Sequence, residues 1–291
     1  MFSSGYRMLL AVLLVAGIAN TAVAGPSAES LINDRIDKLR QIPDEKRPQA
    51  IAQQVAGLAA DIGALPAGQG KVKLADTLAH LVTPGDPGKE TLQAAADTLA
   101  KSLTETPQPA KNDKPAEPYM ELAMLARYEG VSTTLKDPQL AKADEILVAN
   151  DADVQKADFT LKDLNGKKVT LSALHGQIVL VSFWGTECEP CRKEMADLDL
   201  IYTHFQAQGL AILSVANENE FRIGTFLRKN PGVYHPSVLA DADGKVTKQF
   251  HVDTLPRAFV FDRDGKLVAQ SMDMRTQHQL LLMLAKAGLH P

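Results

Sequence analysis

The first half of the chain has the hydrophobic pattern of α-helices. In AIAQQVAGLAADIGAL, residues 50–65, apolar residues recur every three or four positions, which places them on one face of a helix. Residues 71–82 and 89–103 repeat this stripe, and TPGDPG between them is a helix stop. Shorter helices are expected at 119–128 and 138–148. The sequence therefore predicts an all-α region up to about residue 150.

From about residue 157 the pattern changes to strands. DFTLKDLNGKKVTLSAL, residues 158–174, alternates on both sides of an Asn-Gly pair, which is typical of a β-hairpin. QIVLVSFW, residues 177–184, is continuously apolar, as in a central strand. The expected elements that follow are a helix (189–206), a strand (210–217), a helix (219–229), a short strand (236–240), a hairpin (254–272) and a helix (276–289). This order predicts a three-layer α/β sandwich with a central mixed sheet.

The helical region carries no recognisable catalytic set. Residues 105–118, ETPQPAKNDKPAEP, are rich in proline and charge and predict a linker or long loop. ADTLA occurs at 75–79 and again at 96–100, which indicates either a duplicated helix in a hairpin or solenoid, or low complexity. Its one histidine, His80, is expected at the surface. We expect a helical domain of unassigned role at 25–150 and an α/β domain at 151–291.

The N-terminal 24 residues are typical of a signal peptide. Arg7 precedes an apolar run over residues 8–19, and AVA at 22–24 fits a signal-peptidase site. The run is shorter than the ~20 residues of a bilayer span, so membrane anchoring is the less favoured alternative. No cysteine follows the site, which argues against lipid anchoring. We expect a periplasmic or otherwise extracytoplasmic protein.

Composition and charge narrow the function classes. The chain is 45% hydrophobic and 23% charged, with a net charge of −4, as in ordinary soluble proteins. No basic cluster favours nucleic acid. The chain has only two cysteines, Cys188 and Cys191, in FWGTECEPCRKE. In an oxidising compartment these two thiols form a disulfide, but so small a loop adds little stability.

The cysteine spacing favours redox chemistry over metal binding. Zinc requires four ligands, and one C-x-x-C pair with scattered histidines does not supply them. Covalent haem attachment requires histidine after the second cysteine, where Arg192 stands. No metal or cofactor is expected. Cys188 follows a buried strand and opens a helix whose free N–H groups stabilise a thiolate. Cys191 lies one turn further, and Pro190 suits the first turn.

With this motif, residues 157–289 resemble the TlpA/ResA family of extracytoplasmic thioredoxin-like proteins, which carry FWGTWCEPCKKE or close variants. GLAILSVANE and YHPSVLADADGKVTKQFHVDTLPRAFVFDRDGKLV also follow the family's order. The resemblance implies a thioredoxin-like fold, with Cys188 as the attacking thiol and Cys191 as the resolving thiol, joined as a redox-active disulfide. It also implies a cis-proline at Pro256 facing them.

The resemblance implies further roles. A cis Leu255–Pro256 bond leaves a backbone edge that can pair with an extended client segment. Cytoplasmic thioredoxins have a buried aspartate where this chain has Ser182. ResA-like proteins instead use a glutamate three residues after the second cysteine, which is Glu194 here. It is expected to accept the proton of the resolving thiol; the alternative is a surface glutamate paired with a neighbouring cation.

Two residues depart from the family pattern. Glu187 stands where the family has tryptophan before the first cysteine, and Arg257 follows Pro256 where small polar residues are usual. A cation is therefore expected near the client groove. The residues expected to line this groove are Trp184, Glu187, Glu189, Pro190, Leu255 and Arg257.

The expected function is a thiol–disulfide oxidoreductase that reduces protein disulfides. The resemblance implies apocytochrome c as one client class and a membrane thiol reductant as electron donor. Glu187 and Glu189 flank Cys188 and oppose its ionisation, which favours a reductase. One alternative is an isomerase or oxidase that dimerises through its N-terminal helices. Others are a partner-docking protein and a peroxiredoxin-like peroxidase, although Gly185 occupies the position of the peroxidase threonine.

Overall fold

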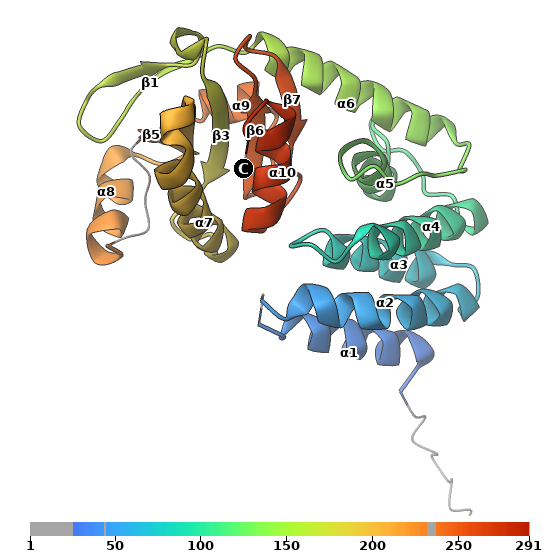
Figure 1. Ribbon diagram of the computed structural model, residues 1–291. Coiled ribbons are helices and arrows are strands. Elements are labelled where there is room, and N and C mark those ends of the chain that lie inside the picture. The colour runs from blue at the N-terminus through green and yellow to red at the C-terminus, as the bar shows by residue number, and fades with distance from the viewer. Residues whose placement is uncertain (1–25, 44, 232–236, 291) are drawn as a thin grey trace, which may run out of the picture.

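The computed structural model describes residues 26–43, 45–231 and 237–290. A stack of helices lies beside a sheet with its own covering helices (Figure 1). The predicted signal peptide lies outside the described residues. Among the described residues, no helix is long and apolar enough to cross a membrane.

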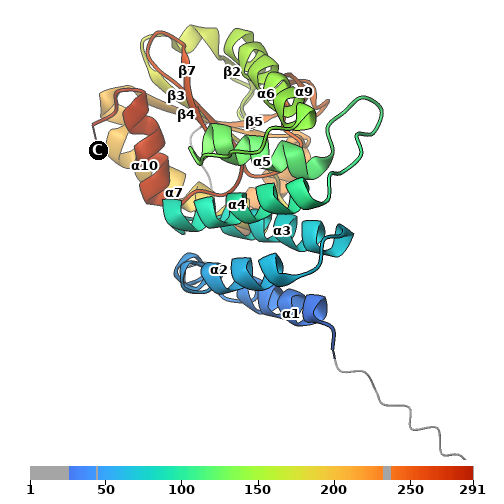
Figure 2. The same cartoon turned by 90° about the vertical axis from the view of Figure 1, so that its right-hand side faces the viewer.

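The N-terminal half is a stack of antiparallel helix pairs (Figure 2). Its helices are α1 (Ala28–Arg40), α2 (Arg47–Ala64), α3 (Gln69–Val82), α4 (Lys89–Glu105), α5 (Glu117–Tyr128) and α6 (Pro138–Lys156). The predicted apolar stripe of α2 is buried throughout, at Ile51, Val55, Leu58 and Ile62. Helices α3 and α4, which carry the repeated ADTLA, pack against each other. The proline-rich segment joins α4 to α5 within the stack, so it is a loop of this half.

The C-terminal half contains a mixed five-stranded sheet in the order β5-β4-β3-β6-β7. Strand β3 is parallel to β4 and antiparallel to β6. The strands are β3 (Ile178–Trp184), β4 (Leu210–Ala216), β5 (Val238–Ala240), β6 (Arg257–Phe261) and β7 (Leu267–Gln270). A separate hairpin, β1 (Thr160–Lys162) and β2 (Lys168–Thr170), precedes them. Both predicted hairpins and the thioredoxin-like fold are confirmed.

Helices cover both faces of this sheet. They are α7 (Glu189–Phe205), α8 (Glu220–Lys229), α9 (Lys245–Gln249) and α10 (Gln277–Lys286), with short 3₁₀ turns at Ser172–Leu174 and Gln206–Gln208. Every residue of β3 is buried. Its alternate residues Ile178 and Leu180 pack with α7 and α10, whereas Phe183 packs on the opposite face with Phe250 and Phe259. Alternation along a strand sends successive side chains to opposite faces. The short helix α9 was not predicted.

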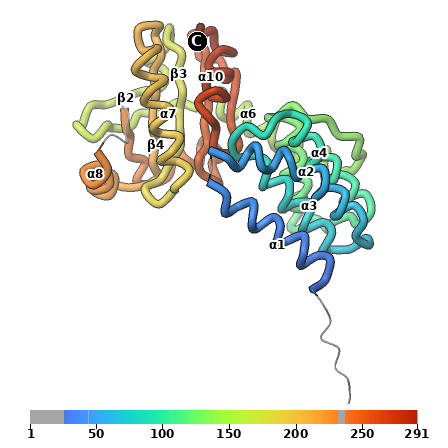
Figure 3. Tube along the Cα trace, turned by 60° about the horizontal axis from the view of Figure 1, so that its bottom comes forward, coloured from blue at the N-terminus to red at the C-terminus, as the bar shows by residue number. Residues whose placement is uncertain are grey.

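The two halves are in contact along one side of the sheet. Figure 3 shows the helical stack next to the side that carries α10, away from α8. Helix α6 continues to Lys156, so the predicted boundary between residues 150 and 151 falls inside it. The side-chain amide of Gln155 binds the backbone at the start of β7. It accepts a hydrogen bond from the Leu267 N–H at 2.7 Å and donates one to the Gly265 carbonyl at 2.9 Å.

Candidate active site

The two cysteines form a disulfide at the N-terminus of α7, with Cα atoms 5.3 Å apart. Cys188 is the N-cap of this helix, and its Sγ accepts a hydrogen bond from the Cys191 N–H at 3.2 Å. Unpaired N–H groups at a helix start stabilise a thiolate when the bond is reduced. Cys191 is only 1% exposed, whereas Cys188 is partly exposed. Cys188 is therefore the sulfur that a client can reach.

The loop before β6 lies beside the turn that leads into Cys188. Its Leu255–Pro256 peptide bond is cis, as expected. A Cβ atom on Gly185, in the turn before Cys188, would lie 3.4 Å from Leu255 Cδ1. This distance is an ordinary van der Waals contact, so the two loops lie next to each other. Leu255 itself is 41% exposed, so its side chain remains accessible at this junction.

Glu194 lies one helical turn after Cys191 and is buried, with 2% exposed. Its Oε2 accepts a hydrogen bond from the Arg275 N–H at 3.3 Å, and its Oε1 has no hydrogen-bond partner among the described residues. Burial raises the pKa of this carboxyl to about 8, against the opposing effect of Arg275. The alternative of a surface glutamate is thus excluded. A group with this pKa can exchange protons near neutral pH.

Comparison with known proteins identifies the family. The AhpC/TSA family matches residues 153–270. The thiol-disulfide oxidoreductase ResA of Bacillus subtilis (strain 168) is 41% identical over 112 residues, 38% of this chain and 62% of that protein. The ResA of Bacillus cereus (strain ATCC 10987 / NRS 248) is 30% identical over 169 residues, 58% of this chain and 94% of that protein. The chain belongs to the ResA family of thiol-disulfide oxidoreductases.

Among solved structures, StoA from Bacillus subtilis is 22% identical to this chain, with a TM-score of 0.39. The match covers 44% of this chain and 96% of StoA. The AhpC/TSA match begins near the end of α6 and leaves α1 to α5 outside. The family therefore accounts for the cysteine pair and its sheet.

Trp184 does not line the client groove of this ResA-family domain. Its side chain is 1% exposed and packs with Cys191 and Met195. The indole ring also lies 5.8 Å from the Phe226 ring. Trp184 ends the central strand, where both faces of the sheet are covered, so its side chain lies under the disulfide. The prediction that Trp184 lines the client groove is wrong, because its side chain is buried and packs with Cys191.

Arg257 also differs from expectation, because it faces the helical half. Its guanidinium lies 5.3 Å from the Tyr128 ring centroid and 5.6 Å from that of Phe259, within cation–π range. It donates to Gln270 Oε1 at 2.8 Å, and Gln270 Nε2 donates to Asp151 Oδ1 at 2.6 Å. Burial lowers the pKa of Arg257. Arg257 therefore links α5 and α6 to the sheet. Contrary to the prediction, its guanidinium does not face the client groove.

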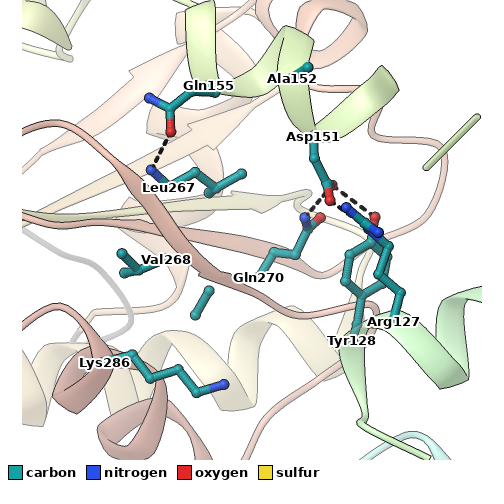
Figure 4. A pocket seen from close by; sticks show the side chains of 10 residues that line it. Arg127, Tyr128, Asp151, Ala152, Gln155, Leu267, Val268, Gln270 and Lys286 are labelled. Carbon is teal, nitrogen blue, oxygen red and sulfur yellow. Dashed lines mark hydrogen bonds and ion pairs between the residues drawn. The ribbon is translucent and has the colours of Figure 1, made fainter. Parts of the chain in front are cut away.

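The Asp151 network lines a cavity of about 440 Å³ beside β7 (Figure 4). Asp151 also accepts hydrogen bonds from Arg127 Nε at 2.6 Å and from the Tyr128 hydroxyl at 2.9 Å. Lys286 of α10 forms the opposite wall. Neither cysteine lines this cavity, so its residues hold the two halves together and do not form the thiol site.

Arg275 is a residue that the sequence analysis missed. Its side chain is 5% exposed and forms an ion pair with Glu129, at the end of α5. It also donates to the Thr83 carbonyl at 3.4 Å, at the end of α3. The helical half thus holds the guanidinium, while the backbone N–H of the same residue holds Glu194. No local motif could have revealed this contact, because Arg275 and Glu129 are 146 positions apart.

The glutamates that flank Cys188 each have a cationic partner. Glu187 Oε1 lies 3.1 Å from Arg222 Nη2, and Glu189 Oε1 lies 3.4 Å from Lys193 Nζ. All four side chains are at least 44% exposed, so solvent screens each pair. These cations reduce the negative potential that the two glutamates impose on the sulfur.

Side-chain hydrogen bonds to Thr186 hold the turn between β3 and Cys188. Glu218 Oε1 accepts hydrogen bonds from the Thr186 N–H at 3.2 Å and from its hydroxyl at 3.1 Å. Arg222 Nε donates to the Thr186 hydroxyl oxygen at 3.1 Å, and Arg192 Nη1 donates to the Thr186 carbonyl at 3.2 Å. Sequence analysis missed Glu218 and Arg222, which lie more than 30 positions after this turn.

No group of three or more His, Cys, Asp and Glu side chains within residues 26–43, 45–231 and 237–290 could hold a metal ion.

Proposed function

We propose that this protein is an extracytoplasmic oxidoreductase that reduces protein disulfides through a dithiol/disulfide cycle of Cys188 and Cys191. The observation that carries this proposal is the partly exposed Cys188 above a buried Cys191, with buried Glu194 one turn further along α7. The predicted signal peptide supports the location. ResA-family membership supports the thiol chemistry.

In the first step, the reduced Cys188 thiolate attacks one sulfur of a client disulfide. A mixed disulfide forms, and the other client sulfur leaves as a thiolate that takes a proton from water. The N-terminus of α7 favours this step, because its N–H groups and dipole stabilise the attacking thiolate.

In the second step, Cys191 loses its proton to the Glu194 carboxylate, and its thiolate attacks Cys188 Sγ. The client leaves with its second thiolate, and the protein holds the Cys188–Cys191 disulfide. Two electrons have passed from the dithiol to the client. Because the pKa of Glu194 in this oxidised form is about 8, the transferred proton has a stable position near neutral pH.

The cycle requires a thiol reductant to reopen the disulfide by the reverse exchange. In an oxidising compartment we propose a membrane thiol reductant for this step, and apocytochrome c as one client class. Cys191→Ser protein tests the client proposal, because the mixed disulfide on Cys188 then has no resolving thiol. Identification of the trapped proteins would name the clients.

The direction of electron flow is tested by equilibrating the protein with glutathione buffers. We expect a potential near that of thioredoxin, about −270 mV, because Glu187 and Glu189 oppose thiolate formation. A potential near about −120 mV, that of a strong oxidant, would favour an oxidase. Light scattering would reveal a dimer, which would favour the isomerase alternative. Steady consumption of peroxide would favour the peroxidase alternative.

A further inference from the structure

A second cavity, of about 270 Å³, lies between the helical half and the cis-proline loop. Helix α5 lines it with Met120 and Met124, and the α/β half contributes Leu255 and Met272. Methionine side chains adapt to varied apolar shapes. This cavity therefore has a flexible apolar wall built from both halves of the chain.

The cavity continues from the proposed client edge. Leu255 precedes the cis-proline, at the backbone position where an extended client segment is expected to pair. The same residue, 41% exposed, lines the cavity together with Thr254. A client segment paired with this edge would place a side chain near its reactive cysteine at the mouth of the cavity.

The polar lining is mostly acidic. Glu117, Glu121 and Asp273 supply carboxyl groups, and His80 supplies one imidazole. His80 Nδ1 lies 3.1 Å from Glu121 Oε2, and this hydrogen bond raises the pKa of His80 to about 9. The imidazolium therefore offsets one carboxylate near neutral pH, and Glu117 remains. Burial raises the pKa of Asp273, so a nearby cationic side chain would favour its charged form.

Two carboxyl groups near this cavity have an oxygen without a hydrogen-bond partner among the described residues. Glu121 is 2% exposed, and its Oε1 has no hydrogen-bond partner among the residues that the structure describes. Asp76, one turn before His80 on α3, has a buried Oδ1 in the same condition. A buried acceptor without a donor costs free energy that a ligand N–H can recover. The cluster therefore favours a cationic hydrogen-bond donor.

We propose that this cavity is a client-binding subsite for a lysine or arginine side chain next to the client's reactive cysteine. This inference rests on the proposed disulfide reductase function. The aliphatic stem of such a side chain would pack on Met120, Met124 and Leu255, and its charged head would bind the carboxylates. An acidic side chain would be repelled. An uncharged apolar one would leave Glu121 Oε1 without a donor.

The test uses the full mature chain and three disulfide-bonded peptides that differ at one position. Lysine, norleucine or glutamate stands immediately before the cysteine, and a second series places it immediately after. In at least one series we expect kcat/KM to fall from lysine to norleucine to glutamate, with lysine about tenfold or more above glutamate, since only lysine donates charge-assisted hydrogen bonds to the carboxylates. Equal rates for all three peptides in both series would overturn the subsite.

Two variants place the preference in this cavity. Glu117→Gln changes an exposed position and Glu121→Gln a buried one; each is expected to lower the lysine-to-norleucine ratio about threefold or more. The matched control is Glu145→Gln, at an exposed position of α6 that does not line the cavity. An unchanged ratio in Glu117→Gln would overturn the assignment even if Glu121→Gln did not fold. Failure to reduce any of the peptides would instead contradict the proposed function.

Discussion

The two halves of this chain differ in how their contribution to the site is encoded. In the α/β half, the cysteines, the strand before them and Glu194 lie within 17 residues, from Ile178 in β3 to Glu194 in α7. The helical half has no such motif. Its residues act through long-range contacts, such as that of Glu129 with Arg275. A motif therefore locates the thiol chemistry, whereas only the fold shows what surrounds it.

The consequence is a division of roles. The α/β half supplies the sulfur atoms and the proposed proton acceptor, Glu194. The helical half holds Arg275 and Arg257 from behind the site and forms one wall of the cavity at the cis-proline loop. Substitutions in the α/β half are expected to change whether the reaction occurs. Substitutions in the helical half are expected to change the pH dependence of the reaction or its choice of client.

The largest effect is expected at the cysteines. Cys188→Ser should lower disulfide reduction about a thousandfold or more, because the attacking thiolate is lost. Cys191→Ser should instead accumulate mixed disulfides. Brief alkylation of the reduced protein, followed by peptide mapping, should label Cys188 first, since Cys191 is 1% exposed. Predominant labelling of Cys191 would reverse the two roles.

The next largest effect is expected at Glu194. Glu194→Gln removes the proposed proton acceptor for Cys191, and general acid–base groups contribute about 10²–10⁴-fold in rate. We expect at least about a tenfold slower release of the client and a flatter rate-versus-pH profile. Single-turnover measurements on a model disulfide would follow this step. An unchanged profile would show that Glu194 takes no part in proton transfer.

The same substitution should stabilise the fold at high pH. Burial raises the pKa of Glu194 from 4.5 to about 8, so its contribution to folded-state stability is fully present below about pH 4.5 and is lost as the pH rises through about 8. Glutamine does not ionise. Glu194→Gln should therefore gain about 1–3 kcal/mol of unfolding free energy at pH 9 relative to its effect at pH 4. Urea unfolding at the two pH values measures this; an equal effect at both would contradict the raised pKa.

These residues also show how far sequence reasoning reaches. The hydrophobic pattern predicted α2, β3 and both hairpins, because each leaves a signal within a short stretch of the sequence. The cis bond at Pro256 followed from a family motif. The surroundings of Trp184 and Arg257 did not, because burial and cation–π contacts depend on elements distant in sequence. Arg257 was expected near the client groove, but its guanidinium instead packs on the Tyr128 ring of α5.

A smaller effect is expected from the contact between Glu129 and Arg275. Glu129→Gln removes the anion that holds the guanidinium in the helical half. The released charge is then free to act on Glu194, whose carboxylate already accepts a hydrogen bond from the same residue's backbone. We expect the pKa of Glu194 to fall and the rate-versus-pH profile to move about one unit lower.

Glu90→Gln is the matched control for this shift, since Glu90 is exposed in the first turn of α4. Its rate-versus-pH profile should follow that of the unaltered protein. If both variants gave the same profile, the helical half would have no effect on the proton acceptor. If only Glu129→Gln moved it, and to higher pH, the direction of the effect would be wrong.

The smallest expected effect concerns the reduction potential and lies wholly within the α/β half. Arg222 pairs with Glu187 and also donates to Thr186 next to it. A nearby cation stabilises the Cys188 thiolate and thus the reduced form. Arg222→Gln should therefore make the potential more negative, by about 10–20 mV, since solvent screens this partly exposed side chain. Arg228→Gln, at an exposed position on the same helix, is the control and should leave the potential unchanged. Glutathione equilibration at low and high salt measures both, and the difference should shrink as salt screens the charge. A shift to a less negative potential in Arg222→Gln would mean that Glu187 and Glu218 do not act on the sulfur, and that the reductase direction has another cause.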